Sequence, residues 1–202
     1  FKYVDHTHAD AVVTISNTSD GEERIREIYG NRVVIVPYVM PGFDLAKEVG
    51  RLFSEMASDE TEGMVLLNHG IFSFGSTARK SYDRMIDLVN LAEQYLVSQN
   101  ACDNEEKVSN IKSKKIRNDV SQLRQKVSSV AGNPVLLNLT NSQLGASFSN
   151  RKDVEIIATR GPLTPDHVIR TKRIPMIGRD VEKYVKEYIS YFNTHKTNAK
   201  EK

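Results

Sequence analysis

The sequence contains a single cysteine, Cys102, among its 202 residues. An intramolecular disulfide is therefore excluded, and the cysteine content gives no indication of an oxidising compartment. Long hydrophobic runs are also lacking, because no apolar stretch approaches the roughly 18–20 residues that span a bilayer. The first ten residues do not resemble a signal peptide, since acidic side chains and histidines interrupt them. These absences lead us to expect a cytoplasmic protein with no membrane partner.

A strong charge of either sign is absent as well. The net charge of +2 is too small to indicate a nucleic-acid or membrane partner. One basic run, residues 112–117, contains no interleaved aromatic side chain, so a solvated surface is favoured over a nucleic-acid patch. Charged residues make up 27% and hydrophobic residues 39% of the chain, which is ordinary for a globular protein. We therefore expect one or two globular domains and no nucleic-acid partner.

Three of the five histidines fall in two short motifs. His6 and His8 are separated by one residue, and His69 ends the apolar run 64–67. If His6 and His8 lie on a strand, their side chains point to the same face, where a histidine at another strand end could join them. Three neutral imidazoles around a divalent ion, with one position open, are typical of a catalytic zinc site. The His-x-His pair by itself is equally compatible with a structural role.

Hydrophobic periodicity predicts strands and helices in alternation over the first half of the chain. Residues 4–16 are interpreted as one buried strand. A second strand, rich in β-branched residues, is predicted over 32–38, and Pro37 either ends this strand or places it at the edge of the sheet. The apolar pattern further predicts helices over 22–29, 44–56 and 78–99, and short strands over 64–67 and 71–74. The helix over 78–99 is the clearest, with Ser76 or Thr77 as its cap.

The second half of the chain has a weaker pattern. Residues 100–116 are polar and without periodicity, as in a linker or a solvated helical extension. The region after this segment is expected to contain a helix ended by Gly132, a buried strand over 134–139, a strand or helical turn over 153–159, and a last helix over 179–192. The predicted organisation is therefore a first domain over 1–99, a connection over 100–116 and a C-terminal region over 117–202.

The order and spacing of these motifs resemble the class II aldolase and adducin family. The resemblance covers about residues 1–99 and rests on His6-Thr7-His8, Val36-Pro37-Tyr38 and Leu66-Leu67-Asn68-His69-Gly70. The stretch 159–172 is similar to a segment of proteins that fuse a rhamnulose-phosphate-aldolase-like domain to a short-chain dehydrogenase. No Gly-x-x-x-Gly-x-Gly loop of a dehydrogenase occurs in this sequence. The resemblance implies an α/β (α+β) fold with a central mixed or antiparallel sheet flanked by helices, followed by a small α/β C-terminal region.

The resemblance also implies an activity. A zinc ion bound by His6, His8 and His69 would act as a Lewis acid in the retro-aldol cleavage of a ketose 1-phosphate, such as rhamnulose 1-phosphate. The products would be dihydroxyacetone phosphate and an aldehyde, and the enzyme would be a lyase that assembles as a homo-oligomer, a tetramer in this family. A pentose-phosphate 4-epimerase using the same site is the alternative. A third possibility is a non-catalytic, adducin-like oligomerising module. The presence of all three histidines argues against it.

Further site residues follow only from the resemblance. The family's catalytic glutamate and phosphate-binding loops precede the histidine pair, and nothing in residues 1–5 matches them, so we expect the chain to be N-terminally incomplete. Without that glutamate the chain by itself would be inactive. Alignment through Gly30-Asn31 makes Glu23, or its neighbour Glu22, the candidate proton donor, with a plain first-turn acid of a helix as the alternative. His167 is a candidate for lining the active site, with capping or packing as the alternative.

Overall fold

The computed structural model describes residues 1–101, 113–140, 142–164, 167 and 170–198, with the backbone alone for 113–117 and 198. Internal contacts divide the chain into two units. Unit 1 comprises Phe1–Asp103 and Pro162–Arg173, and unit 2 comprises Asn104–Gly161 and Ile174–Lys202. Among the described residues, no helix is long and apolar enough to cross a membrane.

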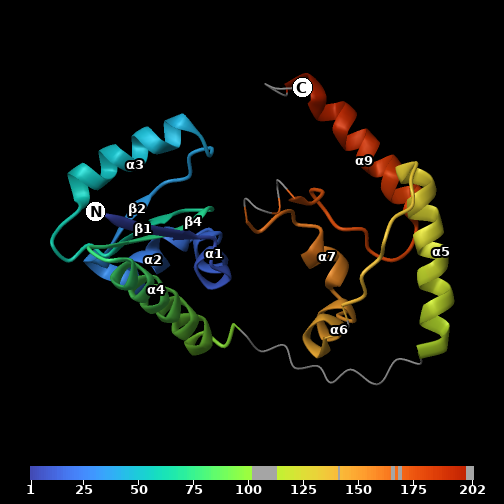
Figure 1. Cartoon of the computed structure of the whole chain (residues 1–202), viewed down its shortest axis with the longest axis horizontal. Helices are drawn as coiled ribbons and strands as arrows, with labels where there is room; N and C mark the ends of the chain where they lie inside the picture. The colour runs from blue at the N-terminus through green and yellow to red at the C-terminus, as the bar shows by residue number, and fades with distance from the viewer. Residues whose placement is uncertain (102–112, 141, 165–166, 168–169, 199–202) are drawn as a thin grey trace. The chain divides into compact units, whose positions relative to one another are not determined.

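A four-stranded mixed sheet forms the centre of unit 1 (Figure 1). Its strands are β1 (Tyr3–Thr7), β2 (Val33–Val36), β3 (Gly63–Leu66) and β4 (Gly70–Gly75), in the spatial order β1-β4-β3-β2. β4 pairs antiparallel with both β1 and β3, whereas β2 runs parallel to β3. The predicted mixed sheet flanked by helices is thereby confirmed.

Helices cover both faces of this sheet. They are α1 (Asp10–Ser16), α2 (Gly21–Tyr29), α3 (Phe43–Met56) and α4 (Ala78–Ser98), and the 3-10 turn η1 (Gly30–Arg32) follows α2. Figure 1 shows α3 on one face and α1, α2 and α4 on the other. Of the two predicted caps, Thr77 is the one that begins α4, and its side chain accepts a hydrogen bond from the Lys80 amide at 3.1 Å.

Each face of the sheet has its own hydrophobic core. On the face of α1, α2 and α4, buried side chains such as Ile25, Val65 and Leu88 pack together. On the face of α3, Leu45 and Leu52 pack on strand residues that include Val36, Met64 and Phe74. Since all four residues of β2 and of β3 are buried, these strands are covered on both faces. This explains why they read as continuous apolar runs in the sequence.

The expectation of one long strand over residues 4–16 is wrong. The strand ends at Thr7, and Asp10–Ser16 form α1, which buries Val12, Val13 and Ile15. A short apolar run is compatible with either a buried strand or a buried helix, and the β-branched residues favoured the strand. Packing of α1 against α4 decides in favour of the helix, because tertiary contacts outweigh intrinsic propensity.

The described part of unit 2 contains helices joined by loops, and no strand. Its elements are α5 (Ser113–Ala131), α6 (Gln143–Ser149), α7 (Val154–Ala158), α9 (Val181–His195) and the 3-10 turn η2 (Lys196–Asn198). The strand expected over 134–139 is not formed, and Leu136 there is 93% exposed. Of the two possibilities at 153–159, the helical turn is found. The C-terminal region is therefore not α/β in the residues that the structure describes.

Candidate metal centre

His6 and His8 are placed by β1 and by the residues that follow it. His6 lies within β1, opposite Phe72 of β4, and His8 lies between β1 and α1. Gly70 of β4 leaves room for both rings. A Cβ atom at Gly70 would come within 2.8 Å of His8 Cδ2, 3.2 Å of His6 Cε1 and 2.6 Å of the Thr7 carbonyl oxygen. The absence of a side chain at Gly70 is therefore a requirement for this arrangement of the two imidazoles.

His69 comes from the tight turn between β3 and β4. The amide of His69 donates to the carbonyl of Leu66 at 3.1 Å, which closes the turn. Asn68 adopts a left-handed conformation with a φ of 59°, a region that Asn tolerates better than most side chains. Since β4 pairs with both β3 and β1, the start of β4 brings His69 beside the histidine pair.

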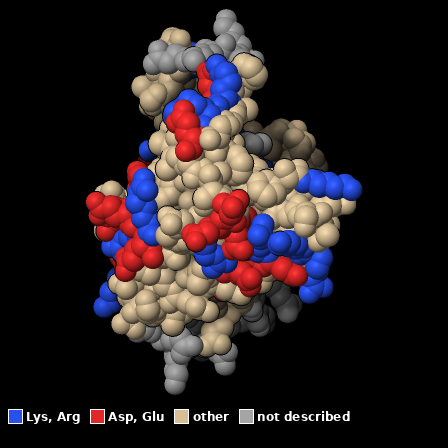
Figure 2. All heavy atoms as spheres, turned by 90° about the vertical axis from the view of Figure 1, so that its left-hand side faces the viewer, with Lys and Arg blue, Asp and Glu red and all other residues tan. Residues whose placement is uncertain are grey.

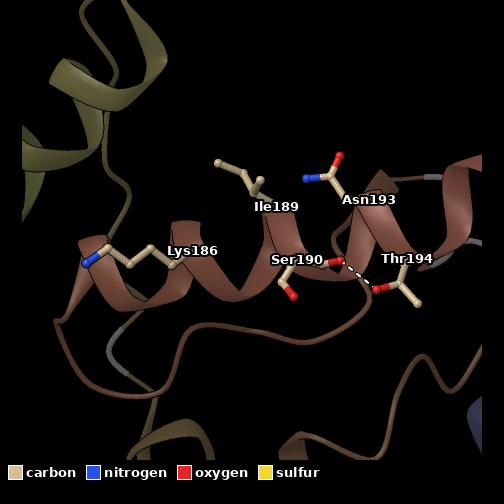
Figure 3. Close-up of a pocket in the computed structure, with 5 residues that line it drawn as sticks. All are labelled: Lys186, Ile189, Ser190, Asn193 and Thr194. Carbon is tan, nitrogen blue, oxygen red and sulfur yellow. Dashed lines mark hydrogen bonds between the residues drawn. The ribbon is translucent and has the colours of Figure 1, made fainter.

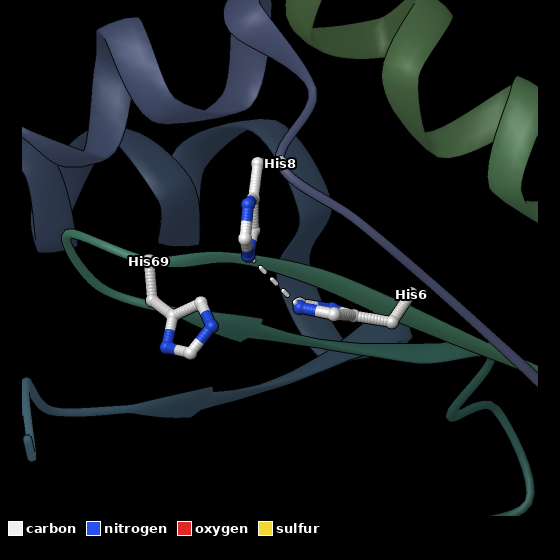
Figure 4. A group of neighbouring side chains, drawn as sticks. All are labelled: His6, His8 and His69. Atoms are coloured by element: carbon white, nitrogen blue, oxygen red, sulfur yellow. Dashed lines mark hydrogen bonds between the residues drawn. The ribbon is translucent and has the colours of Figure 1, made fainter. Parts of the chain in front are cut away.

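The three imidazoles converge as a metal site requires (Figure 4). One potential ligand atom from each of His6, His8 and His69 can be chosen so that all lie within 4.8 Å of one another. The Nε2 atoms of His6 and His8 are 3.1 Å apart. Two nitrogens bound to one zinc ion at about 2.0–2.1 Å in tetrahedral geometry would be roughly 3.3–3.4 Å apart. The separation of His6 and His8 is therefore already close to that of two ligands of one ion, and His69 lies within reach of both.

The orientation of His6 is fixed by its surroundings. Its Nδ1 lies 3.0 Å from the carbonyl oxygen of Ile71, so Nδ1 carries the proton and donates it. This tautomer leaves a lone pair on Nε2, the atom that faces His8. The ring also stacks on Phe72, with centroids 4.1 Å apart and planes at 18°. A backbone carbonyl that orients a ligand imidazole is a regular feature of metal sites in proteins.

The surroundings of His69 favour its neutral form. Burial lowers the pKa of His69, and the nearby His6 and His8 lower it further because a second positive charge would be repelled. Its Nδ1 is buried and has no hydrogen-bond partner among the described residues. Figure 4 shows a ring nitrogen of His69 facing the other two imidazoles. A neutral imidazole is the form that binds a metal ion, so this set of donors fits a divalent cation.

The other predicted site residues are not part of this cluster. Glu22 and Glu23 are exposed in the first turn of α2, where Glu22 pairs with Arg26 at 2.7 Å. Neither belongs to the group of possible metal ligands found among the described residues. His167 is exposed, and its Nδ1 lies 2.8 Å from the Thr164 hydroxyl oxygen. The structure thus brings together three of the six predicted residues.

Two residues important to the site were overlooked in the sequence. Asn17 accepts a hydrogen bond from the Asn68 side chain at 3.1 Å. Gly70 was noted as part of the Asn-His-Gly motif but not as the residue that makes room for His6 and His8. A glycine directly after a strand-terminal histidine is the signal that could have indicated such a close approach.

Surface features elsewhere offer less chemistry. An open hollow lies along one side of α9, lined by Lys186, Ile189, Ser190, Asn193 and Thr194 (Figure 3). One helix supplies all five side chains, and they do not include a metal-ligating or nucleophilic group paired with a base. Figure 2 shows acidic and basic side chains intermingled on one face of the molecule. This agrees with local pairs such as Arg79 with Asp83, and differs from the single-sign surface typical of nucleic-acid binding.

Comparisons with known proteins bear on the same residues. The family model described as the class II aldolase and adducin N-terminal domain matches residues 1–96, and the model described as the second domain of class II aldolases matches residues 114–202. The chain is 28% identical over 231 residues to a Bacillus subtilis (strain 168) protein named uncharacterized oxidoreductase YuxG. That match includes 98% of this chain but only 32% of the Bacillus subtilis protein. The chain therefore spans about a third of the length of this relative.

Two solved structures are also similar. The N-terminal class II aldolase domain of a conserved Thermoplasma acidophilum protein is 44% identical, with a TM-score of 0.41, over 46% of this chain and 41% of that one. An aldolase II superfamily protein from Pseudomonas syringae is 21% identical, with a TM-score of 0.38, over 59% of this chain and 47% of that one. With both of its family models matched in order along the sequence, the chain belongs to the class II aldolase and adducin family.

Proposed function

We propose that this chain provides the zinc site of a class II aldolase that cleaves a ketose 1-phosphate, such as rhamnulose 1-phosphate. Membership of the family supports an aldolase- or epimerase-type activity. The observation that carries the proposal is the convergence of His6, His8 and His69, whose ligand atoms lie within 4.8 Å of one another. The donor set of three imidazoles, with no carboxylate among them, favours zinc over magnesium or calcium.

The chain's own residues would prepare this site in three ways. His6, His8 and His69 would hold the ion, which when bound supplies Lewis-acid polarisation of the hydroxyl and carbonyl oxygens of the substrate. The Ile71 carbonyl accepts the Nδ1 proton of His6 and so fixes its tautomer, which would leave Nε2 to bind the ion. Burial, together with the nearby His6 and His8, lowers the pKa of His69 and so favours its neutral form. The protein would therefore offer three neutral donors without the cost of removing protons from them.

We further propose that Glu23, or its neighbour Glu22, takes the proton from the substrate hydroxyl that becomes the aldehyde oxygen, and donates it in the reverse, condensation direction. We propose His167 as a side chain that lines the site. Both glutamates are exposed at the start of α2, so they are accessible to a substrate or to a second copy of the chain. A homo-oligomer, a tetramer by resemblance, would allow such residues to act across a subunit boundary. Sedimentation velocity on the full chain tests this assembly, and a monomer at micromolar concentration would contradict it.

The activity is tested by product analysis. The protein expressed from its complete reading frame, loaded with zinc, is incubated with rhamnulose 1-phosphate and with ribulose 5-phosphate, and dihydroxyacetone phosphate is measured with a coupled assay. We expect cleavage of the ketose 1-phosphate, and an at least ~100-fold loss in His6→Ala and His69→Ala because the metal is no longer held. His195→Ala, in the last turn of α9, is the matched control and should retain activity.

Two outcomes would redirect the proposal. Conversion of ribulose 5-phosphate to its 4-epimer without cleavage of either sugar would favour the pentose-phosphate epimerase. Equal zinc binding and equal cleavage by the wild type, His6→Ala and His69→Ala would contradict the three-histidine site.

A further inference from the structure

Two hydrogen bonds in series connect the turn of His69 to a segment far away in the sequence. The Asn68 Nδ2 group donates to Asn17 Oδ1 at 3.1 Å, and the Asn17 Nδ2 group donates to the Leu163 carbonyl oxygen at 2.9 Å. Asn17 therefore uses both of its side-chain functions, the acceptor toward Asn68 and the donor toward Leu163. All three residues belong to unit 1.

Both ends of this connection are constrained. On one side, Asn68 holds its left-handed conformation immediately before His69, so a movement of Asn68 would also change the direction of the His69 peptide. On the other side, Thr164 follows Leu163 and is buried at 6% exposure. Asn17 itself is half-buried at the C-terminal end of α1, the helix that follows His8. The connection thus touches both pieces of backbone that present the histidines.

Thr164 extends the connection to His167. The Thr164 hydroxyl lies 2.8 Å from His167 Nδ1, and the His167 amide donates to the Thr164 carbonyl at 3.1 Å. The His167 carbonyl in turn accepts bonds from the Thr171 amide at 3.0 Å and from the Thr171 hydroxyl at 2.7 Å. His167 and Thr171 are therefore hydrogen-bonded in series to Thr164, the residue that follows Leu163.

We propose that Asn17 is a positioning residue that couples metal binding at His69 to the docking of Pro162–Arg173 on the rest of unit 1. This inference rests on the proposed metal site and goes beyond it. An ion that fixes His69 also fixes the Asn68 side chain, which lowers the entropic cost of ordering Asn17 and Leu163. Because such coupling is reciprocal, docking of Leu163 raises the metal affinity by the same factor.

Two substitutions separate the two hydrogen bonds. Asn17→Asp retains the acceptor for Asn68 but loses the donor to Leu163. Asn68→Gly retains the left-handed backbone but loses the donor to Asn17. Asn31→Asp, an exposed change in η1 of the same unit, is the matched control.

The full chain is digested with trypsin, with and without zinc, and cleavage is followed by mass spectrometry. Cleavage after the exposed Arg170, Lys172 and Arg173 reports docking of the segment, and cleavage after Lys196 serves as the internal reference. Zinc affinity is measured separately by calorimetry on the same proteins. Coupling between sites in proteins is commonly 5-fold or more, so we use that factor as the expected effect.

In metal-free protein, Asn17→Asp should be cleaved after these three residues about 5-fold faster than the wild type and Asn31→Asp. Zinc should slow this cleavage about 5-fold or more in the wild type and in Asn31→Asp, but not in Asn17→Asp or Asn68→Gly. Both of those variants should bind zinc more weakly by a similar factor.

The inference is overturned if zinc binds and leaves wild-type cleavage unchanged, or if Asn17→Asp behaves like Asn31→Asp. Absence of zinc binding in the wild type would instead contradict the proposed function. The proposed coupling would then be contradicted as well. The cleavage rates of the metal-free proteins would still show whether Asn17 holds Leu163 in place.

Discussion

His69 has a different environment from the two histidines that it faces. It is half-buried with a buried Nδ1, whereas His6 is exposed on an edge strand of the sheet. Burial and the neighbouring imidazoles lower the pKa of His69, so the folded protein resists protonation at this position. The protonation of a single side chain is therefore linked to the stability of the fold.

The sign of this linkage gives a prediction. As the pH falls through 6.5, the ordinary pKa of histidine, His69 takes up a proton in the unfolded chain before it does so in the folded one. The free energy of unfolding of metal-free protein should therefore decrease on acidification from pH 7.5 to pH 5.5. Urea denaturation at several pH values should show a steeper decrease for the wild type than for His69→Gln. Parallel curves for the two proteins would contradict a lowered pKa at His69.

Among single residues, those of the metal site could be predicted from sequence spacing. His6, His8 and His69 were predicted to meet, and their ring nitrogens do converge. Residues whose role depends on a partner remote in the sequence could not be predicted. Nothing near Asn17 indicates that it bonds to both Asn68 and the Leu163 carbonyl, because those contacts exist only once α1, the turn and residue 163 are assembled.

At the scale of elements, the site depends on how closely β4 approaches the end of β1. β1 pairs with β4 through residues that include Thr7 opposite Ile71, directly beside Gly70. A side chain at Gly70 would displace the Thr7 carbonyl or the ring of His8. The metal site is thus a property of this pair of strands as much as of the three histidines.

Gly70→Ala should therefore weaken zinc binding by about 10-fold or more while the fold persists, because misplaced support commonly costs 10–100-fold in metal affinity. Gly50→Ala is the matched control, since a Cβ atom at Gly50 in α3 meets nothing within 4 Å. That control should leave the zinc affinity unchanged and raise the free energy of unfolding by roughly 0.5–1 kcal/mol. Calorimetry and urea denaturation measure the two effects, and equal zinc affinities in both variants would contradict the role given to Gly70.

The elements themselves were predictable where helical periodicity was long. The helix expected over 78–99 is α4, Ala78–Ser98, because its apolar stripe extends over many turns. α1 was not predictable, since seven residues rich in Val and Ile give too short a pattern to distinguish helix from strand. The strand expected over 134–139 is not formed, because a strand needs a neighbouring strand to pair with. Leu136 in this segment is 93% exposed.

At the scale of the whole molecule, the buried hydrophobic residues are unevenly distributed. Both hydrophobic cores are built from unit 1 residues. In the described part of unit 2, Val181 is the one hydrophobic residue that is buried. Large apolar residues there, such as Leu144 and Ile156, are exposed at 72% and 67%. Hydrophobic burial therefore stabilises unit 1 far more than unit 2 within a single chain.

Hydrogen exchange should reveal this difference. Amides of β3, β4 and α4 lie beside the two cores and should exchange at least ~100-fold more slowly than those of α5 and α9 in the isolated chain. Mass spectrometry of peptic fragments measures both sets in one sample. Equal protection of the two units would show that unit 2 is stabilised by contacts other than burial within one chain, such as those of an oligomer.

The central claim is that three histidines from β1, its following loop and the β3–β4 turn form one metal site. Its most direct test is the zinc content of the full chain after equilibration with the ion and removal of the excess, measured by elemental mass spectrometry. We predict about one zinc ion per chain in the wild type and in His195→Ala, and close to none in His6→Ala, His8→Ala and His69→Ala. Zinc retained equally by all five proteins, or by none of them, would contradict the claim.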